Sequence, residues 1–229
     1  PLAVEGVEQA LPGEVADLVR KNEKLEPSFL QGHIGDVNPG DGRDWRGEIR
    51  QTVAAIYPAL SQAIQAARPV KIDTLTTARR EFLVPLDIAL FREWLDRYQK
   101  DPAKCSSGEW VDAGFAADWH QASAKRKLTE THLPITLSAI GLGPIGMLFH
   151  PAELYSCYGL SIRRDSPFAD TLVVGYADGI IGYLPDPNAY KAGEYAAVVV
   201  PKILDYPPFT PTAAREVTAA GIELLKAVR

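Results

Sequence analysis

The sequence predicts a mixed β-sheet flanked by helices, of the α/β or α+β class. Apolar residues recur at helical spacing in several segments, and short β-rich runs lie between them. Strands and helices alternate most regularly in the last hundred residues. No linker divides the chain, so we expect residues 1–229 to form a single domain.

The first seventy residues are predicted to be mainly helical. Helices are expected over 14–24 and 45–67, and a short apolar strand over 28–32. Pro58 lies inside the second helix and predicts a kink or a break, because proline lacks an amide hydrogen. The stretch 35–42 is rich in glycine, aspartate and asparagine, which is typical of turns.

The middle of the chain predicts one strand, two helices and a hairpin. An extended strand over 71–85 precedes two helices with polar faces, 87–100 and 107–127. The β-rich runs 133–142 and 145–149 flank Gly143-Pro144, which predicts a hairpin at that turn.

The last eighty residues predict two helices around two short strands. Pro151 suits the first turn of a helix that extends to about Arg163. Strands are expected over 171–176 and 180–184, and an amphipathic helix over 212–228.

Composition excludes several classes of protein. Lysine and arginine number 24 and aspartate and glutamate 29, so the net charge of −5 argues against nucleic acid as the main partner. No apolar run approaches the ~20 residues that cross a bilayer, so we expect no transmembrane segment. Cys105 and Cys157 are expected to be separate thiols. Four histidines and two cysteines offer few possible ligands for a metal site built from those residues alone.

Three stretches carry side chains that could do chemistry, and each also has a simpler interpretation. His150 and Glu153 stand three residues apart and could face one point, although such pairs also cap helices. The loop 32–39 offers glycines and short polar groups, or it is a structural turn in which Asp36 caps backbone amides. The stretch 175–195 holds four tyrosines, which could be a half-buried aromatic edge. His33 is a further candidate within the loop.

Three blocks occur in the order found in one enzyme family. They are FLQGHIGDVNP at 29–39, LFHPAEL at 148–154, and VGYADGIIGYLP at 174–185. Together they resemble the neutral/alkaline ceramidases, zinc-dependent amidases that split the amide bond of N-acylated sphingoid bases. The resemblance covers most of this chain but only the second half of the family's catalytic domain, without its C-terminal β-sandwich domain.

The resemblance implies roles for individual residues. Glu153 and Tyr183 fall on zinc ligands of the family, and the two histidine ligands would come from the N-terminal half of the domain, which this chain does not contain. Asn38 stands at the position of the proposed catalytic serine, as in bacterial relatives, and could orient water or donate a hydrogen bond to an oxyanion. Asp36 is the second catalytic candidate, expected to shape the loop rather than act as a base. Asp178 stands where sphingolipid-cleaving members carry asparagine.

The leading hypothesis is therefore a zinc-dependent hydrolase that cleaves an N-acyl sphingoid or a related lipid amide with metal-activated water. Its expected partners are the small-molecule or lipid substrate and the N-terminal half of the same domain. The resemblance also implies a secreted or periplasmic protein. The sequence begins at Pro1 rather than methionine, which suggests a processed product, a fragment or a domain. Two alternatives stay open: a non-catalytic binding or structural protein that keeps the fold, and a zinc hydrolase of an unrelated amide or ester.

Overall fold

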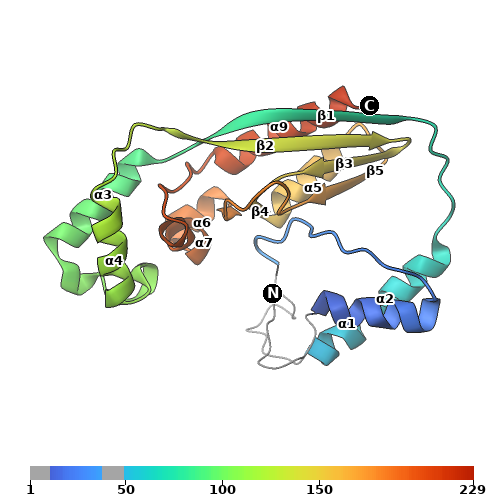
Figure 1. The fold of residues 1–229 in the computed structure, drawn as a ribbon, viewed down its shortest axis with the longest axis horizontal. Helices are drawn as coiled ribbons and strands as arrows, with labels where there is room; N and C mark the ends of the chain where they lie inside the picture. The colour runs from blue at the N-terminus through green and yellow to red at the C-terminus, as the bar shows by residue number, and fades with distance from the viewer. Residues whose placement is uncertain (1–10, 38–48) are drawn as a thin grey trace. The chain divides into compact units, whose positions relative to one another are not determined.

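The structure is a computed structural model that describes residues 11–37 and 49–229. These residues divide into two compact units. The helical unit contains residues 11–30 and 49–71, and the sheet unit contains residues 31–37 and 72–229. Figure 1 draws the elements of both units. The expectation of one domain that is half of a larger catalytic domain stays a prediction.

The helical unit pairs two helical segments. Helix α1 (Leu11–Leu18) continues into a π-helical turn, η1 (Val19–Glu23), and both pack near α2 (Ile49–Ala66). Glu23 joins them, because its Oε1 accepts hydrogen bonds from the hydroxyls of Tyr57 at 2.9 Å and Ser61 at 2.6 Å. These bonds tie the end of η1 to α2. Pro58 lies inside α2 without interrupting it, so of the predicted kink or break, the break does not occur.

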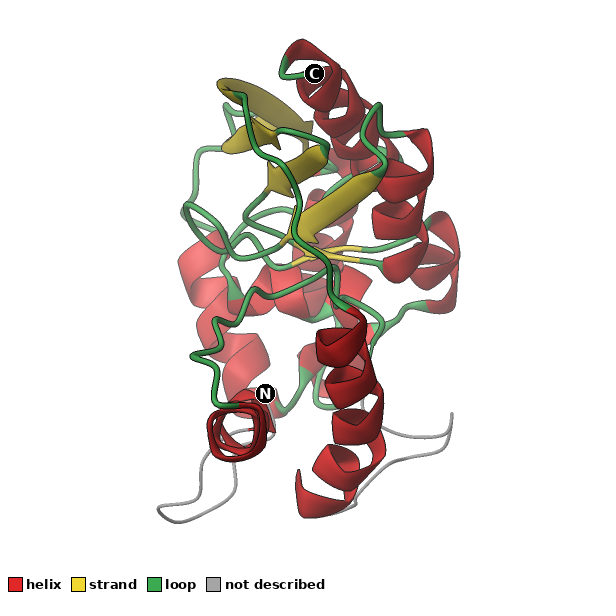
Figure 2. Ribbon diagram, turned by 90° about the vertical axis from the view of Figure 1, so that its right-hand side faces the viewer, coloured by secondary structure: helices red, strands yellow, loops and turns green. Residues whose placement is uncertain are grey.

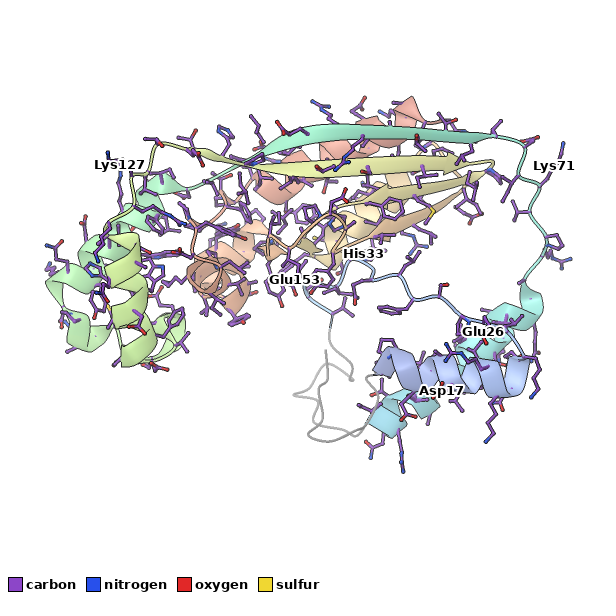
Figure 3. All side chains as sticks on the ribbon, viewed as in Figure 1. Asp17, Glu26, His33, Lys71, Lys127 and Glu153 are labelled. Atoms are coloured by element: carbon purple, nitrogen blue, oxygen red, sulfur yellow. The ribbon has the colours of Figure 1, made fainter. Side chains whose placement is uncertain are left out.

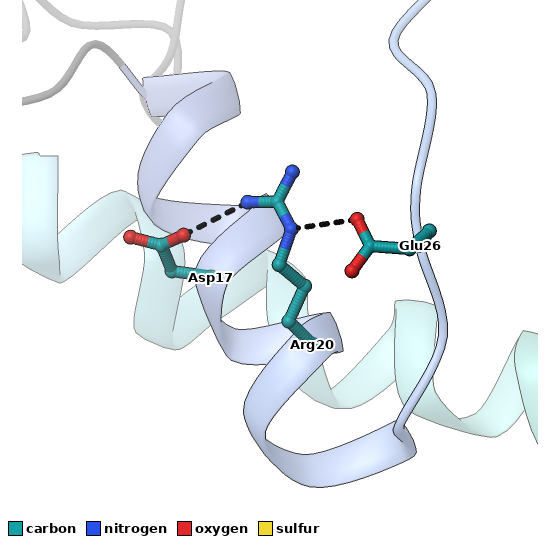
Figure 4. A network of polar contacts seen from close by, with 3 residues as sticks. All are labelled: Asp17, Arg20 and Glu26. Atoms are coloured by element: carbon teal, nitrogen blue, oxygen red, sulfur yellow. Dashed lines mark hydrogen bonds and ion pairs between the residues drawn. The ribbon is translucent and has the colours of Figure 1, made fainter.

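An ion-pair network closes the first helical segment of this unit. The guanidinium of Arg20 contacts Asp17 at 2.9 Å and Glu26 at 3.0 Å (Figure 4). Lys24 then adopts a left-handed φ of 59°, which ends the helical turn. The predicted strand over 28–32 is wrong. Its apolar side chains Phe29 and Leu30 are 62% and 51% exposed, and no described strand pairs with it to supply hydrogen bonds.

A four-stranded sheet organises the sheet unit. The strands are β1 (Leu75–Pro85), β2 (His132–Leu142), β3 (Ile145–Phe149) and β5 (Asp170–Val174), in the order β1-β2-β3-β5. Strand β2 is antiparallel to both β1 and β3, whereas β5 is parallel to β3. The predicted hairpin is confirmed, and its Gly143 takes a φ of 56° that favours glycine. The glycines at 141, 143 and 146 therefore belong to a hairpin.

Two helices cover one face of this sheet. Helix α5 (Ser156–Asp165) connects β3 to β5, and α9 (Ala213–Ala227) packs along β1, β2 and β3 (Figures 1 and 2). Alternate residues of β2 are buried under them, among them Ile135, Leu137 and Ala139. The contact with α9 is close, because a Cβ on Gly221 would lie 2.5 Å from Leu148 Cδ2. The sheet and both helices form one apolar core.

A second core lies among the remaining helices. Its elements are α3 (Ile88–Lys100), η2 (Pro102–Lys104), η3 (Gly108–Trp110), α4 (Ala113–Ser123), α6 (Pro187–Ala192), α7 (Tyr195–Val198) and α8 (Val200–Ile203). Asp87 and Asp112 cap α3 and α4 by accepting amide hydrogen bonds at 2.9 Å. Trp94, Trp110 and Trp119 fill the centre with edge-to-face contacts.

One prediction near the site needs correction. The helix expected from Pro151 begins at Ser156 instead, and Glu153–Leu154 form a short strand, β4, parallel to β6 (Tyr183–Leu184). The predicted α/β class, with a mixed sheet flanked by helices, is confirmed. Cys105 is buried and Cys157 exposed, so the prediction of separate thiols is also confirmed. Within residues 11–37 and 49–229, no helix is long and apolar enough to span a membrane.

Candidate functional site

The candidate site lies where the parallel strands β3 and β5 end. Because the two strands run in the same direction and α5 connects them, their carboxyl ends meet at one edge of the sheet. Loops at this edge of α/β sheets commonly bind ligands. The residues that follow the two strands, 150–155 and 175–183, contain most of two of the three sequence blocks, and Figure 3 labels Glu153 among them.

Backbone hydrogen bonds join these two segments along their length. The bonds run from His150 N to Val174 O at 3.0 Å, Ala177 N to His150 O at 3.0 Å, Ile181 N to Pro151 O at 3.0 Å, and Glu153 N to Gly182 O at 2.8 Å. The predicted helix start at Pro151 fails for this reason. Residues 151–154 pair with a segment about thirty positions later, so they are extended rather than helical.

The first block lies against the other two. Gly35 N donates to Leu154 O at 3.0 Å, and Gly175 N donates to Gln31 O at 2.9 Å. Gly35 is required at this crossing, because a Cβ there would lie 2.4 Å from Glu153 O. The loop 31–37 and the two strand-end segments therefore form one hydrogen-bonded cluster.

Asp36 holds this loop against helix α5. Its carboxylate accepts hydrogen bonds from Ser156 N at 2.6 Å and from Ser156 Oγ at 2.9 Å. A carboxylate at this position accepts a hydrogen bond from a helix amide that has no partner within the helix. Its negative charge also interacts favourably with the positive end of the helix dipole. These contacts fit a residue that shapes the loop. Asn38, the other catalytic candidate, lies outside the described residues.

Glu153 and Tyr183 are the two predicted zinc ligands, and they are register partners on β4 and β6. Side chains at paired positions of neighbouring strands lie side by side. Burial, together with the nearby Glu153 carboxylate, raises the pKa of Tyr183 to about 12. The ring of Tyr195 packs edge-on against Tyr183 with 6.2 Å between ring centroids. Glu194, the preceding residue, accepts a hydrogen bond from the Tyr155 hydroxyl at 3.0 Å.

Tyr176 is a residue of this site that sequence reasoning did not assign. Its hydroxyl donates to Glu153 Oε1 at 2.6 Å, and its backbone takes a φ of 56°. An aromatic residue in this left-handed region costs roughly 1–2 kcal/mol. Asp178 has a similar φ of 60°. In the sequence, Tyr176 looks like any other member of a tyrosine-rich stretch, so only the fold reveals its contact with Glu153.

The two histidine candidates are part of the packing behind this edge. His150 is 1% exposed, and burial together with the neighbouring His33 lowers its pKa to about 4. His150 Nδ1 accepts a hydrogen bond from Ala152 N at 3.2 Å. Its Nε2 and His33 Nδ1 are buried without a hydrogen-bond partner among the described residues. His150 is therefore a neutral core group at neutral pH.

Asp178 lies at the outer edge of the cluster. Its carboxylate pairs with Arg79 on β1 at 3.5 Å, and both side chains are largely exposed. An exposed pair at this distance contributes little to stability. The structure thus brings together Asp36, Glu153 and Tyr183 through the backbone bonds of their segments and leaves Asp178 on the surface.

The donor set at Glu153 and Tyr183 fits part of a zinc site. A carboxylate and a phenol can both bind zinc through oxygen, and catalytic zinc sites in proteins use three or more ligands. Among residues 11–37 and 49–229, no cluster of three or more His, Cys, Asp or Glu side chains could hold a metal ion. The pair alone therefore supplies fewer ligands than a catalytic zinc site uses.

The fold resembles two solved ceramidase structures. One is the neutral ceramidase from Pseudomonas aeruginosa, with a TM-score of 0.56 and 16% identity over 93% of this chain and 40% of that chain. The other is a ceramidase complexed with C2, with a TM-score of 0.52 and 16% identity over 94% of this chain and 41% of that chain. This chain therefore spans about two fifths of either structure.

The likeness confirms, at the level of the fold, the resemblance predicted from the three sequence blocks. No protein-family model matches the chain. No curated protein sequence matches it either.

Proposed function

We propose that this chain carries part of the active site of a zinc-dependent amidohydrolase of the ceramidase type. One observation carries the proposal: Glu153 and Tyr183 lie side by side on β4 and β6, at the carboxyl edge of a ceramidase-like sheet. The two residues are thirty positions apart in the sequence, so their pairing is a product of the fold.

In this proposal Glu153 and Tyr183 hold the zinc ion, and histidines from the N-terminal half of the domain complete its coordination. Bound zinc would polarise the amide carbonyl and lower the pKa of a water molecule toward ~7. Without a cation, the phenol of Tyr183 keeps its proton at neutral pH, because its pKa is about 12. Zinc binding at this pair is therefore expected to release a proton and to strengthen as pH rises.

The proposed substrate is an N-acyl sphingoid or a related lipid amide. Asn38 follows the loop 31–37, which backbone hydrogen bonds hold against the segment that carries Glu153. We propose that Asn38 orients the water or donates a hydrogen bond to the developing oxyanion. In known acyl-transfer enzymes such a donor contributes roughly 3–4 kcal/mol. Asp36 supports that loop through Ser156.

The test uses the complete domain, in which the N-terminal half supplies the proposed histidine ligands, and compares it with its Glu153→Ala and Tyr183→Ala variants. Zinc content is measured by mass spectrometry, and fatty acid release is followed with N-acyl sphingosine and a panel of other amides and esters. We expect both variants to lose zinc and turnover. A double variant with stoichiometric zinc and full turnover would refute the proposal. Turnover of other amides or esters alone would favour a different zinc hydrolase, and zinc-free, inactive protein in all forms would favour a non-catalytic role.

A further inference from the structure

We propose that Tyr176 is a positioning residue that orients the carboxylate of Glu153 for cation binding. The inference rests on the proposed function, because it assigns Glu153 to the metal. It adds a residue to which the sequence analysis gave no role. The observation behind it is the hydrogen bond from the Tyr176 hydroxyl to Glu153 Oε1.

The hydrogen bond has the geometry of a strong interaction. Its length of 2.6 Å falls in the range of a neutral hydroxyl donating to a charged carboxylate. In this hydrogen bond the Tyr176 hydroxyl is the donor and the Glu153 carboxylate is the acceptor.

The backbone around Tyr176 is held in place on both sides. Gly175 N bonds to Gln31 O at 2.9 Å, and Ala177 N bonds to His150 O at 3.0 Å. These bonds hold Tyr176 at its left-handed φ of 56°, a conformation that persists only where the surroundings impose it. The same bonds fix the backbone from which the Tyr176 side chain extends, relative to the segment that carries Glu153. Tyr176 is 37% exposed, but the hydrogen bonds of both its neighbours hold its backbone in place.

One hydrogen bond leaves Glu153 able to bind a cation. An ionised carboxylate offers about four acceptor positions, and Tyr176 occupies one of them. Such bonds orient a ligand before the metal arrives, and removing them from metal sites typically weakens metal binding 10–100-fold. Tyr183 is the neighbouring ligand in the proposal. The orientation of Glu153 therefore decides whether its carboxylate oxygen and the phenol oxygen of Tyr183 can reach the same ion.

The first experiment needs neither metal nor turnover. Tyrosine in the full chain is labelled with ¹³C at Cζ, and the Tyr176 signal is assigned by its loss in Tyr176→Phe. At neutral pH we expect the Tyr176 Cζ signal to shift in Glu153→Gln, because the charged acceptor of its hydroxyl proton becomes a neutral amide. A Tyr176 signal that Glu153→Gln leaves unchanged overturns the proposal.

The second experiment measures the zinc affinity of the complete domain, which includes the proposed histidine ligands, by competition with a chromophoric chelator. Tyr176→Phe keeps the ring and the backbone strain and removes only the hydroxyl. Tyr57→Phe is the matched control, because it removes another tyrosine-to-glutamate hydrogen bond, to Glu23 in the helical unit. We expect Tyr176→Phe to bind zinc about 10–100-fold more weakly and Tyr57→Phe to match the wild type. Equal affinity in Tyr176→Phe and the wild type overturns the proposal.

The two experiments separate this inference from the proposed function. If the wild type binds no zinc while the ¹³C signal shows the Tyr176–Glu153 hydrogen bond, the metal function fails and the orientation of Glu153 by Tyr176 stands. If zinc binds and Tyr176→Phe has no effect, the inference alone fails. If Tyr176→Phe does not fold, Glu153→Gln still decides the coupling from the other side of the hydrogen bond.

Discussion

Replacing Lys202 with methionine should change how the stability of the protein depends on pH. Lys202 is 2% exposed, and its ammonium lies 3.8 Å from the ring centroid of Trp94. It also donates to the carbonyls of Glu109 and Val198. Burial, with a contribution from Arg97, lowers its pKa from 10.5 to about 8. Methionine keeps a similar apolar stem and does not titrate.

The magnitude follows from that pKa. A fall from 10.5 to about 8 corresponds, at about 1.4 kcal/mol per pKa unit, to about 3 kcal/mol. The unfolded chain binds the proton more tightly than the folded chain, so the free energy of unfolding rises as pH increases from 8 to 10.5. Below pH 8 the folded chain carries the buried charge, and this stabilisation is absent. Between pH 7.5 and 9.5 the wild type should gain about 2 kcal/mol relative to Lys202→Met.

The assay is urea unfolding of both proteins, followed by tryptophan fluorescence at pH 7.5, 8.5 and 9.5. Taking the difference between the two proteins cancels other groups that titrate in this range. The absolute difference at pH 7.5 is not diagnostic, because methionine leaves two carbonyls without their donor, at about 1–3 kcal/mol each. Only its change with pH counts. A difference that stays constant within about 0.5 kcal/mol from pH 7.5 to 9.5 would refute the reasoning.

Three further predictions concern the site itself. Gly159→Ala should destabilise the protein by about 1–3 kcal/mol in urea unfolding, because the new Cβ would lie 2.1 Å from His33 Cγ; unchanged stability would contradict the packing. His150→Gln should remove a loss of about 3 kcal/mol that the wild type shows as pH falls from 6.5 to 4, because the folded chain resists protonation of His150. If the free energies of unfolding of the two proteins change in parallel over that pH range, this prediction is wrong. Asp36→Ala should lower stability by about 1 kcal/mol, because Ser156 N loses its acceptor. If Asp36→Ala instead leaves stability unchanged and abolishes turnover, Asp36 acts as a base.

Sequence reasoning worked best where contacts are local. The hairpin at Gly143 and the last helix, α9, follow from a glycine turn and from helical spacing, and both occur as predicted. The same reasoning failed at Pro151. Proline favours a helix start locally, but residues 151–154 instead bond to residues 181–184, which lie far along the chain. At these residues, strand pairing overrode the local preference for a helix.

The sequence alone determined the fold class and the order of most elements, and its resemblance to the ceramidases singled out Glu153 and Tyr183 as candidates. Periodicity and turn residues encode the first two, because they depend on neighbours along the chain. The tertiary structure decided the rest: the pairing of β4 with β6, the neutral state of buried His150, and the hydrogen bond from Tyr176. Each depends on segments that only folding brings together. Burial and long-range hydrogen bonds have no local signature, so no pattern in the sequence could show them.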